Sequence, residues 1–350
     1  MILKKTFINK KVLITGHTGL KGSWLSLWLS LLGADVYGIS NNFKASKTNF
    51  KNFKMKKNIT NYDIDIKNFI KFKKIINKIK PNFIFHLAAQ SLVSESYKNP
   101  IYNFETNFNG TLNLLEILRL AKFKCVTILI TSDKSYRNFE IKRGYNENDI
   151  LGGDDPYSAS KGSAEFVINS YFKSFLYNKK NIRIAVCRAG NVIGGGDWSN
   201  NRLIPDMMRS IFNNKILKLR NHNSTRPWQH VLDCLNGYLV LASKLTKNKK
   251  LNGQAFNFGP PISSNYKVID VVREIKRNWS LLKWKFTKKN FYESNLLKLN
   301  SNKSLKFLNW KNKLKFKETI KLVTDWYKCL FEKKDVYNFS KNQIKQYEKK

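Results

Sequence analysis

The chain has 350 residues, of which 42% are hydrophobic and 13% aromatic, and its formal net charge is +40. This apolar content excludes an intrinsically disordered protein, because disorder combines high charge with low hydrophobicity. The sequence has no run of about 18 apolar residues, so neither a transmembrane helix nor a membrane partner is predicted. The four cysteines, Cys125, Cys187, Cys234 and Cys329, lie far apart and predict neither a disulfide framework nor a metal site.

The positive charge does not by itself indicate a nucleic-acid-binding protein. Only 11 of the 64 basic residues are arginine, and lysine is spread along the whole chain beside asparagine, isoleucine and phenylalanine. These residue types have AT-rich codons, so a biased genome would produce the same composition. Base-reading surfaces instead concentrate arginine and aromatic residues in one region. We expect no nucleic-acid partner, and keep a basic scaffold with an inactive enzyme fold as an alternative from another class.

Strand-like and helix-like segments alternate along the first half of the chain. Short apolar runs predict strands, at residues 11–15, 35–40, 82–87, 126–131 and 182–188. Longer segments predict helices, at residues 23–32, 68–80, 103–122 and 157–178. The lysine- and asparagine-rich segment 41–62 is expected to form a loop or surface segment. This alternation predicts an α/β fold with a Rossmann-type, doubly wound parallel sheet.

The pattern changes after residue 190, where loops and irregular segments are expected. We expect residues 1–190 to form a dinucleotide-binding domain that carries the catalytic residues. Residues 191–335 are expected to form a smaller C-terminal lobe that binds the substrate and is partly interleaved with the first domain. The basic tail, residues 336–350, is expected to be solvated or frayed.

A glycine-rich turn separates the first predicted strand from the first predicted helix. Its GxxGxxG spacing allows a tight turn, a close approach of the backbone to a pyrophosphate, and close packing of helix on strand. The residues of this predicted phosphate loop are Gly16, His17, Thr18, Gly19, Leu20, Lys21 and Gly22. The turn also interrupts the apolar stretch near the amino terminus, so no secretory signal is predicted and a cytoplasmic location is expected.

The end of the second predicted strand carries no acidic residue. Dinucleotide-binding folds usually place a carboxylate there for the adenosine ribose, whereas this chain has Ser40 and Asn41, with Lys44 following. This position therefore leaves the choice between NAD and NADP open. Asp65 could accept a hydrogen bond from an adenine amino group, or it could be a solvated acid in a loop.

Tyr157 and Lys161 lie four residues apart, on one face of a predicted helix. A nearby cation lowers the pKa of a tyrosine, so the phenolate could act as a base near neutral pH. Tyr337 and Lys341 repeat the spacing in the tail, where a solvated surface is expected. Tyr157 differs because its helix follows the fourth strand, and Ser132 at the end of that strand could bind the same substrate hydroxyl.

Eight motifs together give the chain a family resemblance. They are TGHTGLKG (15–22), HLAAQSLV (86–93), NFNGTLNLLE (107–116), TSDKSY (131–136), DPYSASK (155–161), RAGNVIGGGDW (188–198), RPWQHV (226–231) and AFNFGP (255–260). The chain resembles the extended short-chain dehydrogenases/reductases that modify nucleotide sugars, and among them the CDP-glucose 4,6-dehydratases. Related dehydratases carry an Asp-Glu pair after the fourth strand, whereas this chain has Asp133-Lys134, the pattern of the CDP-glucose group.

The resemblance implies a hydro-lyase that converts CDP-D-glucose to CDP-4-dehydro-6-deoxy-D-glucose with tightly bound NAD. Such an enzyme oxidises C4, eliminates water across C5–C6 and returns the hydride to C6. The implied catalytic residues are Ser132, Asp133, Lys134, Tyr157 and Lys161. Tyr157 would remove the C4 hydroxyl proton, Asp133 would protonate the leaving C6 hydroxyl, and Lys134 would take the C5 proton. A strand-end ion pair without a chemical role is the alternative for Asp133-Lys134.

The resemblance also implies contacts for the cofactor and the substrate. Beyond the phosphate loop, the cofactor residues would be Asp65, Ile66, Leu87, Ala88, Ala89, Thr106, Tyr157 and Lys161. The substrate residues would be Gln90, Ser132, Asn191, Arg202 and Arg226. Helix packing explains Thr106 nearly as well, and His86 and His230 are expected to be structural.

Three other enzyme functions stay open at this point. A nucleotide-sugar 4-epimerase shares the serine, tyrosine and lysine, but it needs no acid–base pair for elimination. A dehydratase acting on another nucleotide sugar and a ketoreductase with dissociable NADP are the others. The resemblance further implies a homodimer or a dimer of dimers through helix 103–122 and the helix of Tyr157. It also implies a role in deoxysugar synthesis for surface polysaccharide such as O-antigen.

Overall fold

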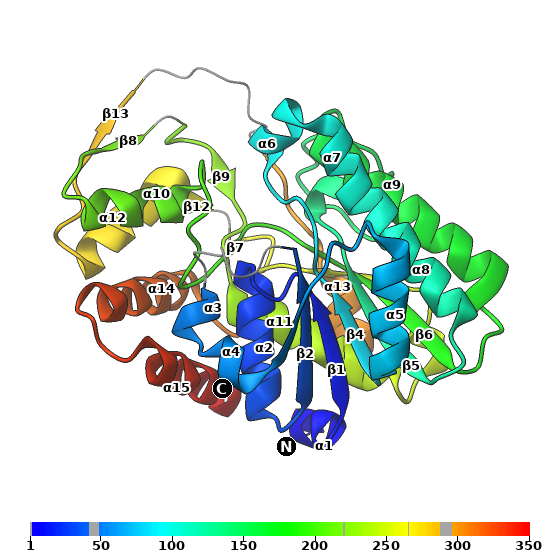
Figure 1. The fold of residues 1–350 in the computed structure, drawn as a ribbon. Helices are drawn as coiled ribbons and strands as arrows, with labels where there is room; N and C mark the ends of the chain where they lie inside the picture. The colour runs from blue at the N-terminus through cyan, green and yellow to red at the C-terminus, as the bar shows by residue number, and fades with distance from the viewer. Residues whose placement is uncertain (1, 42–48, 220, 265, 288–295) are drawn as a thin grey trace.

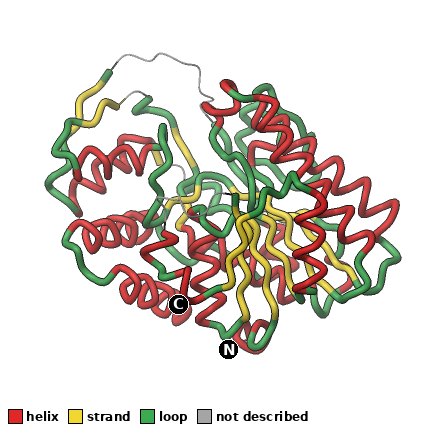
Figure 2. Tube along the Cα trace, in the orientation of Figure 1, coloured by secondary structure: helices red, strands yellow, loops and turns green. Residues whose placement is uncertain are grey.

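A parallel sheet runs through the middle of the computed structural model, which describes residues 2–41, 49–219, 221–264, 266–287 and 296–350 (Figures 1 and 2). Within these residues the sheet has seven strands in the order β11-β6-β5-β4-β1-β2-β3, and every neighbouring pair is parallel. The strands are β1 (Lys11–Thr15), β2 (Asp35–Ser40), β3 (Thr60–Asp63), β4 (Phe83–His86), β5 (Cys125–Ile130), β6 (Ile182–Ala189) and β11 (Ala255–Phe258). The predicted Rossmann-type fold is confirmed.

Helices cover both faces of the sheet (Figure 1). Before β6 they are α1 (Ile2–Phe7), α2 (Leu20–Leu31), α3 (Asn49–Asn52), α4 (Met55–Asn58), α5 (Phe69–Ile79), α6 (Val93–Lys98), α7 (Pro100–Phe104), α8 (Gly110–Leu120) and α9 (Pro156–Tyr171). A π-helical turn, η2 (Glu105–Asn109), joins α7 to α8, and a second one, η4 (Phe172–Leu176), extends α9. A short 3-10 turn, η3 (Asp133–Ser135), follows β5. Each predicted helix in this half is therefore present.

Alternating residues of the strands feed two separate cores. In β1, Val12 and Ile14 belong to a core that includes Trp24 of α2, whereas Leu13 belongs to a core that includes Phe72 of α5. Because side chains alternate across a strand, a strand buried on both faces becomes a continuous apolar run. This explains why KVLIT and CVTILI are recognisable as strands from the sequence.

The segment that we expected to be a loop contains α3, α4 and the edge strand β3. β3 has the sequence TNYD and pairs with β2, with Ser40 opposite Asp63. At the edge of the sheet its side chains are half-buried or exposed, so the strand needs no apolar run. The prediction missed it for this reason. Lys44 lies outside the described residues.

The chain beyond residue 190 is more helical than predicted. Its helices are α10 (Leu203–Phe212), α11 (Val231–Leu245), the 3-10 turn η5 (Lys249–Leu251), α12 (Val268–Asn278), α13 (Asn302–Leu308), α14 (Phe316–Phe331) and α15 (Val336–Lys349). Its short strands outside the main sheet are β7 (Val192–Ile193), β8 (Leu217–Leu219), β9 (Thr225–Arg226), β10 (Gln229–His230), β12 (Tyr266–Lys267) and β13 (Trp284–Phe286). Because β11 returns to the main sheet beside β6, residue 190 does not divide the sheet from the second lobe. No helix in the described ranges is both long and apolar enough to cross a bilayer.

The tail that we expected to be solvated is instead a packed helix, α15. Ile344 is fully buried, and the Tyr347 ring packs edge-on against Trp28 of α2, with 5.5 Å between the ring centroids. The Tyr347 hydroxyl donates to Asp233 Oδ1 at 2.8 Å, and Trp28 Nε1 donates to Glu348 Oε1 at 2.8 Å. The buried residues recur at helical spacing between the lysines, so lysine content concealed an amphipathic helix.

We expect Ile344→Ala to lower the free energy of unfolding by about 2–5 kcal/mol, because it leaves a cavity under α15. The neighbouring exposed residue supplies a control, Lys345→Ala, which should change stability by about 0.5 kcal/mol or less. Chemical denaturation followed by tryptophan fluorescence would measure both. Equal stability of the two variants would mean that α15 does not pack as described.

Candidate active site

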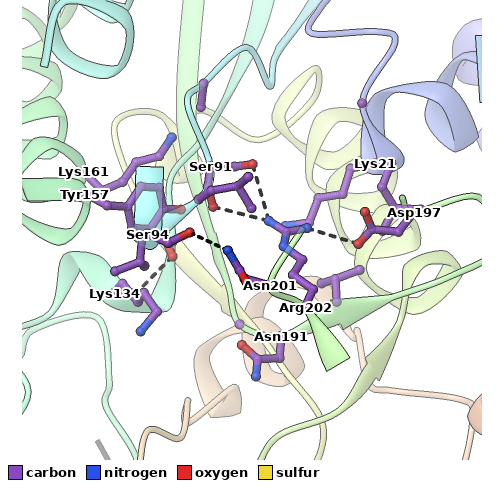
Figure 3. A pocket seen from close by; sticks show the side chains of 18 of the residues that line it. Lys21, Ser91, Ser94, Lys134, Tyr157, Lys161, Asn191, Asp197, Asn201 and Arg202 are labelled. Carbon is purple, nitrogen blue, oxygen red and sulfur yellow. Dashed lines mark hydrogen bonds and ion pairs between the residues drawn. The ribbon is translucent and has the colours of Figure 1, made fainter. Parts of the chain in front are cut away.

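A cavity of about 1590 Å³ opens at the carboxyl ends of the strands (Figure 3). It lies where the chain order of the strands reverses, between β1 and β4, which is where open α/β sheets bind ligands. Its volume exceeds the roughly 300–1,000 Å³ of a pocket for one small ligand. The lining includes both the glycine turn and the second lobe. The cavity therefore has room for two ligands in contact.

The glycine turn forms one wall of the cavity and has no room for a side chain at Gly16 or Gly22. Gly16 has φ +72°, and a Cβ there would lie 2.8 Å from the backbone of Ala88. A Cβ on Gly22 would lie 2.1 Å from the Gly16 carbonyl oxygen. The turn leads into α2, whose first turn contains no acidic residue and receives no side-chain cap. The N–H groups at the start of α2 thus leave a site for an anion such as a pyrophosphate.

Most of the predicted cofactor residues line this cavity, but the side chain of His17 does not. The lining residues are Gly16, Thr18, Gly19, Leu20, Lys21, Gly22, Asp65, Ile66, Leu87, Ala88, Ala89 and Thr106. The His17 ring is buried against Gly38, and its Nε2 lies 2.9 Å from Asn61 Oδ1. Burial lowers the pKa of His17. The His17 side chain thus packs against β2, and the expected contact of this residue with the cofactor stays a prediction.

Two polar residues on this wall, Asp65 and Thr106, differ in their hydrogen bonds. Asp65 accepts from Asn41 Nδ2 at 3.3 Å and from the Lys67 backbone at 2.9 Å. The buried hydroxyl of Thr106 has no hydrogen-bond partner among the described residues. A buried polar atom without a partner costs free energy unless a ligand or water satisfies it. Thr106 is therefore suited to contact a ligand in the cavity.

Ser132, Asp133 and Lys134 form a tight turn directly after β5. Ser132 Oγ accepts from the Lys134 backbone at 3.2 Å and donates to Asp133 Oδ1 at 3.0 Å. Asp133 is buried, and burial raises the pKa of its carboxyl, against the opposing charge of Lys134 and the bond from Ser132. All three residues line the cavity. Asp133 is thus placed to hold a proton in a desolvated site.

Tyr157 and Lys161 face the same cavity from the first turns of α9. Pro156 opens this helix, and the Asp155 side chain caps it by accepting from the Ser158 backbone at 3.0 Å. Burial raises the pKa of Tyr157, opposed by the hydrogen bond with Ser132 and by the charge of Arg202. The charge of Arg202 acts on this phenol, and the expected effect of Lys161 on it stays a prediction.

Lys161 is affected by a second cation in the cavity, Lys21. Burial and then the charge of Lys21 lower the pKa of Lys161 to about 8. Lys21 extends from the glycine turn into the cavity, where its ammonium donates to the Tyr238 hydroxyl at 3.3 Å. Lys134 and Lys161 point in different directions in Figure 3. The sequence placed Lys21 in the phosphate loop, but gave no sign that its side chain reaches so far.

Three of the predicted substrate residues converge from the second lobe. β7 pairs with β10 and β9 pairs with β12, and both Asn191, just before β7, and Arg226, in β9, line the cavity. Arg202 forms an ion pair with Asp197 at 3.2 Å and donates to Ser91 Oγ at 3.4 Å (Figure 3). Asp197 belongs to the GGGDW segment, and the sequence did not identify it as a partner of Arg202.

Gln90 lies between two residues that line the cavity, Ala89 and Ser91, and its expected contact with the substrate stays a prediction. Its Oε1 accepts from the Leu92 backbone at 3.1 Å, and its backbone donates to Asn107 Oδ1 at 2.9 Å. Asn107 also donates to Ser160 Oγ of α9 at 2.9 Å. Asn107 therefore fixes the loop after β4 against α9, the helix of Tyr157, a role that the sequence analysis missed although the residue lies in the NFNGTLN motif.

The two histidines that we expected to be structural are both buried. His86 Nδ1 lies 2.8 Å from Thr15 Oγ1, and His230 Nδ1 accepts from the Leu232 backbone at 3.2 Å. Burial lowers the pKa of each to about 3, so both rings are neutral at physiological pH. The described residues contain no group of three or more His, Cys, Asp or Glu that could hold a metal ion.

The chain is similar to proteins that act on nucleotide sugars. Residues 13–323 match the family model described as GDP-mannose 4,6 dehydratase. CDP-glucose 4,6-dehydratase of Salmonella typhimurium is 39% identical, over 99% of this chain and 98% of that protein. CDP-paratose 2-epimerase of Salmonella typhi is 25% identical, over 90% of this chain and 98% of that one.

Solved structures share the fold at low sequence identity. The epimerase Mth375 from Methanothermobacter thermautotrophicus has a TM-score of 0.83 and 22% identity, covering 95% of this chain and 96% of that one. A dTDP-glucose 4,6-dehydratase from Streptomyces venezuelae, solved with NAD and TYD bound, has a TM-score of 0.78 and 19% identity. The match covers 91% of this chain and 97% of that one.

We expect Lys161→Met to stabilise the ligand-free chain at pH 7. The lysine pKa is about 8 in the folded chain against the usual 10.5, a gap that corresponds to about 3 kcal/mol. Below pH 8 both states are protonated, so the folded state carries the full cost of a buried charge. As the pH rises through 8 towards 10.5 this cost disappears, because the folded chain releases its proton first.

Thermal and urea unfolding at pH 7, 9 and 10.5 would measure this difference. Lys78→Met on the exposed face of α5 is the matched control and should change little at any pH. A Lys161→Met variant that is less stable than the wild type at pH 7 would contradict the described burial of the ammonium.

Proposed function

The chain belongs to the GDP-mannose 4,6 dehydratase family, and from this premise we propose that it is a CDP-glucose 4,6-dehydratase, a hydro-lyase. It converts CDP-D-glucose to CDP-4-dehydro-6-deoxy-D-glucose and water. The relative of Salmonella typhimurium supports this substrate, because it is 39% identical over almost the whole of both chains.

The Asp133-Lys134 pair beside Ser132, in which Asp133 is buried, is the observation that carries the proposal. An epimerase needs a base for the sugar hydroxyl but no acid that protonates a leaving hydroxyl. Asp133 has the environment of such an acid, because burial raises the pKa of its carboxyl. It lines the same cavity as Tyr157, so both groups can act on one sugar. This arrangement supports a dehydratase over the epimerase alternative.

The residues of the glycine-turn wall fit NAD. The narrow turn at Gly16 and Gly22 permits a close backbone approach, and the uncapped start of α2 suits a pyrophosphate. The unpartnered Thr106 hydroxyl and the small side chains of Ala88 and Ala89 suit the nucleoside parts. When bound, NAD supplies the acceptor and later the donor of the hydride. Lys161 would hold the nicotinamide ribose.

Proton transfer from the C4 hydroxyl falls to Tyr157, with Ser132 orienting that hydroxyl. Burial favours the neutral phenol, whereas the bond with Ser132 and the charge of Arg202 favour the phenolate that accepts the proton. Oxidation of C4 comes first because the resulting ketone acidifies the proton on C5. This order makes the subsequent elimination possible.

Elimination then uses the turn after β5. Lys134 takes the proton from C5 while Asp133 protonates the hydroxyl that leaves C6, so that one water is released. After the hydride returns to C6, the proton on Lys134 returns to C5. The proton that Tyr157 took from the C4 hydroxyl finally replaces the proton that Asp133 lost, so both residues return to their starting states. The C5–C6 part of the sugar must therefore lie between Asp133 and Lys134.

The second lobe would hold the CDP group. Asn191 offers an amide, and Arg226 and Arg202 offer planar guanidinium groups that suit a diphosphate. Arg202 is shared with Asp197 in the ligand-free cavity, so binding of a diphosphate would compete with that ion pair. These residues support a substrate with a nucleoside diphosphate group, but they do not distinguish one nucleotide base from another.

We further propose a homodimer, or a dimer of dimers, built on α7–α9. Apolar side chains at Ile101, Phe104, Phe108 and Leu112 follow helical spacing on the α7–α8 segment, and Ile101 is 74% exposed. Phe166 on α9 is 60% exposed. An exposed apolar surface of this kind marks an interaction site. A cytoplasmic location and a role in deoxysugar synthesis for surface polysaccharide complete the proposal, and both derive from the family resemblance.

Turnover of CDP-glucose by the wild type and by Asp133→Asn tests the proposed reaction. The wild type should release a 4-keto-6-deoxy product with loss of water and no net reduction of NAD. Asp133→Asn should still oxidise C4, but should slow elimination by about 100-fold or more, because the amide cannot supply the proton. Reduced cofactor, followed by its absorbance, should therefore accumulate in the variant.

Asp35→Asn, an exposed change at the opposite end of the sheet, is the control and should leave turnover unchanged. Parallel reactions with dTDP-, UDP- and GDP-glucose test the base. If only one of these other sugars were dehydrated, CDP-glucose would be wrong as the substrate, but the proposed dehydration would stand. Interconversion of C4 epimers without loss of water would overturn the dehydratase proposal.

We expect Phe166→Glu to weaken self-association at least tenfold, because it places a charge on the proposed interface. Sedimentation over a concentration series would measure the effect. Phe307→Glu makes the same change at an exposed phenylalanine on α13, which lies outside the proposed interface, and should leave assembly unchanged. Equal assembly of both variants and the wild type would place the interface elsewhere.

A further inference from the structure

The carboxylate of Glu165 is buried behind the catalytic residues, and the mechanism above does not use it. It lies on α9 one helical turn beyond Lys161, and its residue is 5% exposed. Positions four apart share a helix face, so Glu165 and Lys161 both face the end of β5. This position puts a fixed acceptor beneath the turn that carries Ser132 and Asp133.

Two hydroxyl groups connect Glu165 to that turn. Thr131 Oγ1 donates to Glu165 Oε1 at 2.6 Å. The Ser135 hydroxyl shares its one proton between the Ser132 carbonyl oxygen at 2.6 Å and the same Glu165 oxygen at 3.2 Å. The residues on both sides of the Ser132–Lys134 segment are thus held by one carboxylate. Because this carboxylate belongs to the helix of Tyr157, it links the two halves of the catalytic site.

Arg188 on β6 holds Glu165 in place through two bonds. Its Nε and Nη2 donate to the two carboxylate oxygens at 2.7 and 2.6 Å, and both side chains are 4% exposed. Arg188 Nη1 also donates to the Tyr136 hydroxyl at 2.6 Å, just beyond the turn. This two-bond geometry fixes the orientation of the carboxylate as well as its position.

A buried ion pair of this kind is weak evidence for a role in stability. Removing two charges from water costs free energy, and well-packed apolar residues often serve stability as well or better. The pair can, however, hold neighbouring groups in a precise position. Such precision matters at a reacting group, because a displacement of about 1 Å can cost about 100-fold in rate. The hydrogen bonds of Glu165 indicate that the groups held in this way are Ser132 and Asp133.

We propose that Glu165 is a positioning residue, which through Thr131 and Ser135 sets the Ser132–Lys134 turn at the correct distance from Tyr157 and Lys161. Glu165 does not touch the substrate. It sets the geometry in which Ser132 and Tyr157 meet one hydroxyl and Asp133 stays shielded from water. The assignment of reaction steps to this turn rests on the proposed function.

Variants of the two hydroxyl residues test this role while leaving the buried ion pair intact. Thr131→Val is nearly isosteric, and Ser135→Ala removes one oxygen. Each should lower kcat about tenfold with KM changed less than twofold. Because both act through Glu165, the double variant should lose far less than the roughly 100-fold expected for independent effects. Thr131→Ser keeps the hydroxyl and should restore most of the rate.

Ser210→Ala is the matched control for Ser135→Ala. Ser210 is buried on α10, and its hydroxyl donates to the carbonyl three residues earlier at 2.7 Å, as Ser135 does at 2.6 Å. It does not line the cavity, so kcat should stay at the wild-type level. Thermal unfolding of all variants shows whether a loss of rate merely follows a loss of folded protein.

The pH profile separates positioning from simple structural support. Asp133 acts only while protonated, and burial keeps the pKa of its carboxyl raised. A loosened turn admits water and lowers this pKa, so the alkaline limb of the elimination rate should move to lower pH in Ser135→Ala. The limb should not move in Ser210→Ala. An unchanged limb together with multiplicative losses in the double variant, or wild-type kcat in both single variants, would overturn the proposal.

Turnover of CDP-glucose by the wild type shows whether the role of Glu165 or the proposed function itself has failed. If the wild type does not dehydrate CDP-glucose, the proposed substrate or reaction fails. The same variants are then compared on C4 oxidation of whichever nucleotide sugar the wild type oxidises. Ser132 and Tyr157 serve that step in both a dehydratase and an epimerase, so equal oxidation by the wild type and the variants would still overturn the role of Glu165.

Discussion

The parallel register of β1, β4 and β5 is the constraint on which the active site depends. Thr15 lies opposite His86, and His86 lies opposite Leu129, so the three strands end almost level. The segments that follow them, the glycine turn, the Leu87–Ala89 loop and the Ser132–Lys134 turn, are thereby brought to one edge. Parallel strands all direct their carboxyl ends to the same side, so residues more than a hundred positions apart can share one cavity.

Much of this arrangement could be predicted because its determinants are contiguous in the sequence. A strand buried on both faces is a continuous apolar run, and the glycine spacing follows from a backbone approach that admits no Cβ at Gly16. Edge strand β3 lacks the apolar run, and α15 hides its apolar face among lysines. The His17 side chain bonds to the distant Asn61, and the Gln90 backbone bonds to the distant Asn107. No local pattern encodes those contacts.

The electrostatics of the cavity follow from burial more than from pairing. Burial raises the pKa of Asp133 and of Tyr157 and lowers that of Lys161, so each group is displaced towards its neutral form. Spacing alone suggested that the ammonium of Lys161 acts on Tyr157. The structure adds two further cations, because Arg202 acts on Tyr157 and Lys21 acts on Lys161. Charge couplings of this kind depend on tertiary structure, because helix spacing fixes only which residues share a face.

The packing of α15 on α2 has a consequence for the order in which the protein can mature on the ribosome. α2 begins at the glycine turn near the amino terminus, yet Trp28 on its outer face is covered by Tyr347, and the buried Asp233 accepts a hydrogen bond from the same tyrosine. The nascent chain can form β1, α2 and β2 early, but this apolar face stays open until residues 336–347 have left the exit tunnel. Until then, the helix that follows the glycine turn presents a surface that chaperones can bind.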